Sequence, residues 1–193
     1  MSCSHCGRCR QQSGSALSVS AALKQKRPWV LGALARACGM TEKEAAKELP
    51  CEMCVFAPGH AFEKIWKSIS GWDSAIFVSQ QGGFGVKYCG RIPEGRAVSG
   101  IYHFSGEGPL SGHVRLDSIS EICFLSLPFM GRETCSVQFF DLDGSAMFAV
   151  HVGKVAGELS PYARASFMSM REKAEHDGFA VYGGFEIPMY KAV

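Results

Sequence analysis

The sequence predicts an α+β fold in which N-terminal helices precede a large antiparallel β-sheet and a C-terminal helix closes the structure. Three observations favour this fold. Apolar side chains recur at helical spacing within residues 16–70, alternate with polar ones over residues 74–153, and return to helical spacing over residues 161–174. Connections between successive β segments are short, which favours antiparallel pairing because parallel strands need long crossovers.

Length and composition predict one globular domain. The chain has 193 residues, so we expect a single domain at 16–175, a flexible cysteine-rich tail at 1–15 and a C-terminal tail at 176–193. The net charge of +2 is too small to favour nucleic acid as a main partner. No apolar stretch is long enough to span a membrane, and the N-terminus lacks the apolar core of a secretory signal. We therefore expect a cytoplasmic protein.

Helix signals fall in the first 70 residues and near the C-terminus. Thr41 and Glu44 form a capping box that opens a helix ended by Pro50. The two helices of residues 16–49 resemble a helix-turn-helix, but the second carries Glu residues at least as often as Lys residues, so we favour helices packed on the domain. The apolar positions that define the helices are Trp29, Leu31, Leu34 and Cys38 before Gly39, then Phe62, Ile65, Trp66 and Ile69, with a final helix at 162–173.

Period-two alternation predicts seven strands between residues 74 and 153. Gln81-Gly82-Gly83 and Asp143-Gly144 are turn signals between neighbouring strands, the second a strong hairpin signal. The predicted strands are 75–79, 84–89, 98–104, 110–116, 121–126, 136–141 and 146–152.

Nine cysteines are many for a chain of this length. In a reducing compartment they are thiols or metal ligands rather than disulfides. Two groups have metal-ligand spacing, and they could hold zinc or an iron–sulfur cluster, or serve as free or redox-active thiols. Neither group is followed by histidine in the c-type haem pattern. The groups are Cys3, Cys6 and Cys9 in the tail, and Cys51 with Cys54.

A set of short motifs occurs in a characteristic order between Leu49 and Arg171. The motifs are Pro58-Gly59 before the helix with Trp66, Gly71-Trp72, Ile92-Pro93-Glu94-Gly95, Ser111-Gly112-His113, Phe129-Met130-Gly131 and Phe139-Phe140 through Asp143-Gly144-Ser145-Ala146-Met147. In these motifs the chain resembles the HutX/ChuX family of cytosolic haem carriers. The resemblance implies haem as cargo, a homodimer built around a broad antiparallel sheet, and delivery of haem to a haem-degrading or haem-accepting protein. The chain departs from relatives at Gln80 and Ser99, where some members carry histidine.

His113 is the leading candidate for the haem-iron ligand. It lies two positions from Arg115 on one predicted strand, so the two side chains share a face, while Val114 and Leu116 face the core. An arginine beside a nitrogen ligand suits a haem propionate. From the strand pattern alone, a hydrogen-bonded surface histidine beside a solvated arginine is the more frequent arrangement. The Ser-Gly-His motif of the family favours the interpretation of His113 as a haem-iron ligand.

Two further segments carry candidate haem-binding residues. Tyr102 and His103 are neighbours with opposite faces, and either could be the iron ligand. For His103, a surface histidine without a ligand role is an equal alternative. Met130 and Arg132 lie in the Phe-Met-Gly-Arg loop, where the arginine could bind a propionate or pair with a carboxylate. His151 alternates with Ala149 in an apolar strand and is interpreted as structural.

The resemblance implies a haem-binding protein that carries haem and delivers it to a partner. One alternative is a zinc or iron–sulfur protein that uses the cysteines, with the carrier-like core as a scaffold. The other is an enzyme that modifies the tetrapyrrole, although the sequence supplies no catalytic residues or redox cofactor motif for it.

Overall fold

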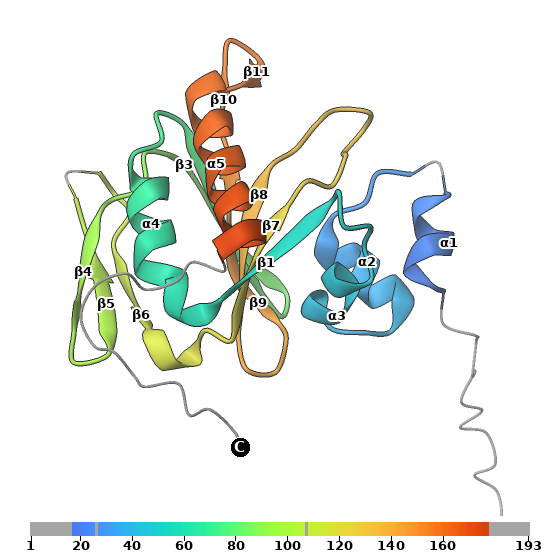
Figure 1. The fold of residues 1–193 in the computed structure, drawn as a ribbon, viewed down its shortest axis with the longest axis horizontal. Coiled ribbons are helices and arrows are strands. Elements are labelled where there is room, and N and C mark those ends of the chain that lie inside the picture. Colours follow the sequence, from blue (N-terminus) through green and yellow to red (C-terminus); the bar gives the residue numbers. More distant parts are fainter. Residues whose placement is uncertain (1–16, 26, 107, 178–193) are drawn as a thin grey trace, which may run out of the picture.

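The computed structural model describes residues 17–25, 27–106 and 108–177. Its order of elements is three N-terminal helices, strands interrupted by one helix, and a long C-terminal helix (Figure 1). None of the helices in these ranges is both long and apolar enough to cross a membrane. The helices are α1 (Val19–Leu23), α2 (Leu31–Cys38), α3 (Glu42–Lys47), α4 (Phe62–Ser70) and α5 (Pro161–Asp177), with 3-10 turns η1 (Gly59–Ala61) and η2 (Leu116–Ser118).

The strands form two antiparallel sheets and one short hairpin. The six-stranded large sheet has the order β1-β7-β8-β9-β2-β3, and the three-stranded small sheet has the order β4-β5-β6. The large sheet contains β1 (Cys54–Pro58), β2 (Ala75–Gln81), β3 (Phe84–Gly90), β7 (Glu121–Leu125), β8 (Ser136–Phe140) and β9 (Ala146–Val152), the small sheet β4 (Gly95–Val98), β5 (Ile101–Phe104) and β6 (Gly112–Arg115), and the hairpin β10 (Lys154–Val155) and β11 (Glu158–Leu159). The predicted α+β class, with an antiparallel sheet and a C-terminal helix, is confirmed.

Two details of the predicted strands are wrong. The single strand predicted at 98–104 is interrupted, because Ser99 (φ 51°) and Gly100 (φ 78°) turn the chain back and make β4 and β5 a hairpin. Strand β1 lies inside the region expected to be helical, where it pairs with β7 along its whole length. Pairing with a strand far along the chain thus decides the structure of residues 54–58.

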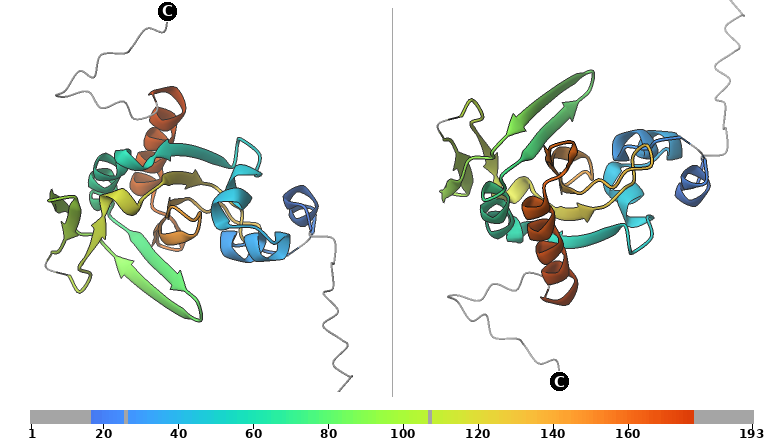
Figure 2. Two further views of the ribbon diagram at one scale, coloured as in Figure 1. Left: turned by 90° about the horizontal axis from the view of Figure 1, so that it is seen from below. Right: turned by 90° about the horizontal axis from the view of Figure 1, so that it is seen from above.

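Helices cover the two faces of the large sheet differently. Helices α4 and α5 pack on one face, and their buried side chains join those of β7, β8 and β9 and of the small sheet in the main core cluster. Helices α1, α2 and α3 pack on the opposite face, over β1, β7 and part of β8. Figures 1 and 2 show these three helices at one end of the molecule and the small sheet at the other. Within the described ranges, strands β2 and β3 contribute no side chain to the cluster beneath these helices.

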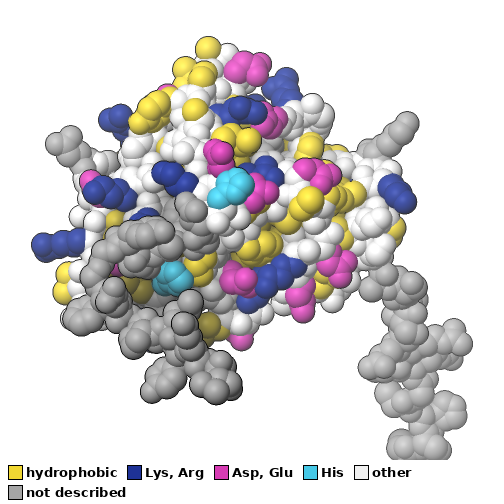
Figure 3. Space-filling model, in the orientation of Figure 1, with side chains coloured by type: hydrophobic (Ala, Val, Ile, Leu, Met, Phe, Trp, Pro, Cys, Tyr) yellow, Lys and Arg dark blue, Asp and Glu magenta, His cyan; other side chains and the backbone are white. Residues whose placement is uncertain are grey.

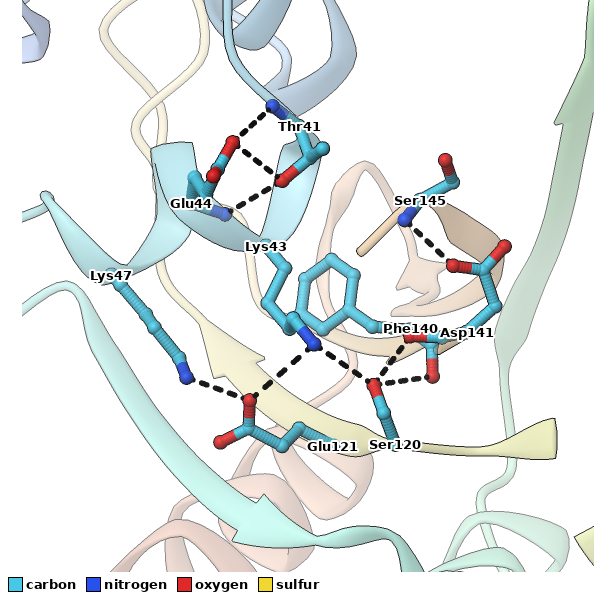
Figure 4. A network of polar contacts seen from close by, with 9 residues as sticks. All are labelled: Thr41, Lys43, Glu44, Lys47, Ser120, Glu121, Phe140, Asp141 and Ser145. Carbon is cyan, nitrogen blue, oxygen red and sulfur yellow. Dashed lines mark hydrogen bonds and ion pairs between the residues drawn. The ribbon is translucent and has the colours of Figure 1, made fainter. Parts of the chain in front are cut away.

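The N-terminal helices are held to the sheet by polar contacts as well as by apolar packing. The predicted capping box of α3 is present, with the Thr41 hydroxyl accepting from the Glu44 backbone N–H and the Glu44 carboxylate accepting from the Thr41 backbone N–H. Lys47 and Lys43 on α3 lie 2.7 and 3.8 Å from the Glu121 carboxylate on β7 (Figure 4). The face in Figure 3 shows basic and acidic side chains interspersed, without a single-sign area.

Candidate functional site

The small sheet brings His103 and His113 together. They are direct cross-strand partners on β5 and β6, and their ring centroids are 6.1 Å apart. Both side chains are exposed, while Val114 between His113 and Arg115 is buried, as the alternation predicts. Arg115 is engaged elsewhere: its guanidinium donates two hydrogen bonds to the Asp117 carboxylate, at 3.1 and 2.7 Å.

Tyr102 is placed in the core, which does not favour its predicted role as an iron ligand. Its side chain is 2% exposed, and its ring packs edge-on against Phe62 at 5.2 Å and against Trp66 at 6.2 Å. Burial raises the pKa of the Tyr102 hydroxyl, so the phenolate form that binds iron is disfavoured. The side chain points to the face opposite His103, so we leave Tyr102 out of the proposed site.

Met130 and Arg132 lie at a different place from the two histidines. They belong to a tight turn in the β7–β8 connection, where Phe129 and Arg132 pair as an isolated bridge around Met130 (φ 53°) and Gly131 (φ 71°). Met130 is 72% exposed. This turn borders a hollow on the large sheet. The predicted haem-binding residues are therefore separated into two groups.

That hollow is one of three that meet at His151. Their volumes are about 370, 450 and 230 Å³, and His151 lines all of them. Together we call them the His151 groove. Its walls are mainly apolar and come from the N-terminus of α2, the uncovered face of the large sheet and the Met130 turn. The apolar lining includes Val30, Leu31, Ile76, Val78, Leu127, Phe129, Phe148 and Ala149.

His151 lies on the floor of the groove in strand β9. It pairs with Ile76 on β2 and with Ser136 on β8, so strands flank it on both sides. Burial is the main cause that lowers the pKa of its imidazole, and the nearby Lys87 ammonium lowers it further. The neutral imidazole, which keeps a lone pair for a metal, is therefore favoured at neutral pH.

Polar and charged groups stand at the groove's edges. Lys87 on β3 lines one end, and Arg132 and Lys154 line the other. Gln80 on β2 also lines the first end. Each end also has a carboxylate, Glu42 at the first and Glu133 at the second, and Glu133 is paired with Arg164. The cations at both ends of the apolar slot suit a flat ligand that carries carboxylates.

The sequence pattern did not identify His151 as a functional residue. A histidine among apolar residues in a strand is typical of a structural residue. The face of the large sheet that carries His151 became a groove wall only because the N-terminal helices pack beside it.

The two predicted cysteine groups have different outcomes. Cys51 is exposed, whereas the Cys54 thiol is half-buried and points at the backbone carbonyl of Ala46, 3.2 Å away. Burial is the largest cause raising the pKa of Cys54, which disfavours the thiolate that zinc and iron bind. Within the described ranges, no three His, Cys, Asp or Glu side chains gather as metal ligands. The other predicted ligands, Cys3, Cys6 and Cys9, lie outside the described residues.

Comparisons with known proteins agree on one family. The model of the family "Haem utilisation ChuX/HutX" matches residues 55–170. The chain is 30% identical to the intracellular haem transport protein HutX of Vibrio cholerae over 157 residues, which cover 80% of this chain and 81% of that protein. The crystal structure of ChuX superposes with a TM-score of 0.75 at 23% identity, covering 82% of this chain and 98% of the other.

The fold also matches about half of a longer protein. The structure of ChuS, described as an Escherichia coli haem oxygenase, gives a TM-score of 0.67 at 14% identity, covering 80% of this chain and 48% of ChuS. At this identity the match concerns the fold alone.

Proposed function

Because this chain belongs to the ChuX/HutX family of haem-utilisation proteins, we propose that it binds haem inside the cell and carries it to an acceptor protein. The observation that supports this function best is the His151 groove. It combines a neutral imidazole, apolar walls and cationic edges, the three features that a haem site needs. We place the protein in the cytoplasm.

In the proposed site the His151 imidazole binds the haem iron from the floor of the groove. Ile76 and Val78 from β2, with Val30 and Leu31 from α2, contact the porphyrin faces. Burying the apolar macrocycle supplies most of the binding free energy, at roughly 25 cal/mol per Å² of apolar surface removed from water.

The propionates bind at the groove's cationic ends. Arg132 and Lys154 flank one end and Lys87 the other, and a guanidinium can hold a carboxylate through two hydrogen bonds. Met130 is exposed at the rim beside Arg132, where it can cover an edge of the macrocycle or approach the iron from the open side.

The open groove suits a carrier. Solvent reaches one side of the bound haem, and a single protein ligand holds the iron, so an acceptor can take the haem without unfolding the protein. We propose that the acceptor is a haem-degrading protein or another protein that uses haem. The shared fold with ChuS is compatible with a catalytic role, but the relative of 30% identity is named as a transporter, and we propose transport.

We also propose that the protein forms a homodimer through strand β3. This strand is at the end of the large sheet's order, so within the described ranges its outer edge pairs with no other strand. Phe84 and Val86 on β3 are 70% and 42% exposed. A long edge strand with exposed apolar side chains is an association surface. Light scattering should show a dimer that Phe84→Ser weakens, whereas Val155→Ser, at an exposed apolar position on β10, should leave it unchanged.

Hemin titration tests the haem site. We expect the wild-type protein to develop a saturable Soret band at one haem per chain. His151→Ala should weaken hemin binding about tenfold or more and change the iron's EPR spectrum, since the iron loses its nitrogen ligand. His113→Ala is the matched control and should bind as the wild type does. Circular dichroism verifies that each variant is folded.

Two results would contradict the proposal. Absence of saturable hemin binding by the wild type would refute the haem-carrier function. Wild-type affinity in His151→Ala together with weak binding by His113→Ala would move the haem site to the small sheet.

A further inference from the structure

The outer face of the small sheet carries two rows of side chains that the haem site does not use. Its inner face is fixed in the core, because Tyr102 and Phe104 on β5 and Val114 on β6 are buried. The strands alternate, so the side chains between these residues point outward. One outward row is Arg96–His103–His113 and the other is Val98–Ile101–Arg115, each in direct cross-strand register.

His103 and His113 are neighbours held on a rigid support. Directly opposed residues of an antiparallel pair have Cβ atoms about 4.5–5.5 Å apart. The ring centroids are 6.1 Å apart with an angle of 37° between the ring planes. Both side chains are exposed, and within the described part of the chain neither imidazole has a hydrogen bond or ion pair, so both rings can turn about their side-chain bonds.

This geometry is unsuitable for a haem that both histidines would bind together. The protein-accessible positions of haem iron lie on opposite faces of the porphyrin, so two histidines that bind one haem must have the macrocycle between them. Here both rings rise from neighbouring strands of one sheet. A macrocycle inserted between them would run into the backbone beneath, and neither ring lines any of the hollows described above.

The same geometry suits a bare metal ion with adjacent ligand positions. Imidazole is a preferred ligand of zinc, copper and nickel. With metal–nitrogen bonds of about 2.0–2.1 Å, two ligands of one tetrahedral ion have their nitrogens about 3.3 Å apart. Small rotations bring the edges of two rings with centroids at 6.1 Å to that separation.

The charged neighbours set the strength of the site. Arg115 is paired with Asp117, and this pairing offsets its charge and occupies the carboxylate. Arg96 lies directly across from His103, and its charge opposes a cation. Two imidazoles, with water completing the shell, therefore make a site of moderate affinity that would be tighter without Arg96.

We propose that His103 and His113 chelate one divalent first-row transition-metal ion, of the nickel, copper or zinc type, on the outer face of the small sheet. The ion is bound away from the His151 groove, since the small sheet and helices α1–α3 lie at opposite ends of the molecule (Figure 2). The sequence motif that suggested a haem ligand at His113 thus marks a separate metal site.

Nickel titration followed by NMR tests this site in the full-length protein. Paramagnetic Ni²⁺ should broaden the backbone amide signals of Tyr102 and Val114, which flank the two histidines, before it affects signals elsewhere in the two sheets. Single substitutions His103→Ala and His113→Ala should each raise the Ni²⁺ concentration needed by roughly tenfold or more, because the chelate is lost. His60→Ala, at another exposed histidine, should change nothing.

A variant with the opposite expected effect sharpens the test. Arg96→Gln should lower the required Ni²⁺ concentration a few-fold at low salt, since it removes a repelling charge beside the ion. Equal broadening in the wild type and in His113→Ala would overturn the proposal, as would absence of broadening in the small sheet at large Ni²⁺ excess. Hemin affinity is measured in parallel, and its loss in these variants would refute the separation of the two sites.

Discussion

Glu121 on β7 should measurably anchor the N-terminal helices that form one wall of the groove. Lys47 Nζ lies 2.7 Å from the Glu121 carboxylate, and the two side chains are 49% and 31% exposed (Figure 4). Coulomb's law in water gives about 1.5 kcal/mol at this distance, and the lost side-chain entropy reduces it to about 0.5–1 kcal/mol. Lys43, at 3.8 Å, adds less.

Glu121→Gln should therefore lower the free energy of unfolding by about 1 kcal/mol and Tm by about 2–4 °C. A double-mutant cycle with Lys47→Met isolates the pair and should give a coupling free energy of about 0.5–1 kcal/mol at low salt. Glu172→Gln, at an exposed carboxylate on α5, is the control. Thermal and urea unfolding in low and high salt measure both quantities.

The salt dependence decides the outcome, because a half-exposed ion pair is screened. A coupling near zero at low salt, or one that is unchanged at high salt, would refute the electrostatic anchor. Hemin affinity should change little in Glu121→Gln, since the buried apolar cluster beneath α1–α3 still holds the groove wall.

Three further predictions concern the core and the groove. A methyl group at Gly59 would overlap the Ile119 carbonyl oxygen, so Gly59→Ala should cost about 2 kcal/mol or more in urea unfolding, whereas Gly83→Ala, in open space, should stay within about 0.5 kcal/mol. Tyr102→Phe should lower the free energy of unfolding by about 1 kcal/mol and leave hemin affinity unchanged, because the Tyr102 side chain is buried in the core. A large loss of hemin binding in this variant would show that Tyr102 belongs to the haem site. Folding lowers the pKa of His151 from about 6.5, so the unfolded chain binds a proton at this residue first as the pH falls. The Tm of the haem-free protein should therefore fall as the pH drops below about 6.5. In His151→Asn the part of this pH dependence that comes from His151 should be absent.

Local patterns correctly predicted the elements whose sequence signals lie close together. Phe62, Ile65, Trp66 and Ile69 at helical spacing are all buried in α4. Thr41 and Glu44 form the expected capping box, and the Asp143-Gly144 turn joins β8 to β9. Each signal spans a few neighbouring residues, so the sequence shows it directly, although the partners that bury the side chains of α4 lie far along the chain.

The sequence patterns did not predict the elements that are stabilised by contacts with residues far along the chain. Residues 54–58 become strand β1 only because residues 121–125 pair with them. The break between β4 and β5 was visible in principle, since Ser99-Gly100 is a turn dipeptide, but the apolar residues on both sides of it favoured one continuous strand.

By itself the sequence determined the fold class, the family, and the outward direction of His113 and Arg115, since period-two alternation fixes which side chains share a face. Only the tertiary structure decided which histidine has which neighbours. Strand register placed His103 opposite His113 and buried Tyr102, while the packing of α1–α3 over part of the large sheet made His151 the floor of a groove bordered by Met130 and Arg132. Register and cavities arise from contacts between segments far apart in the chain, and no local spacing records them.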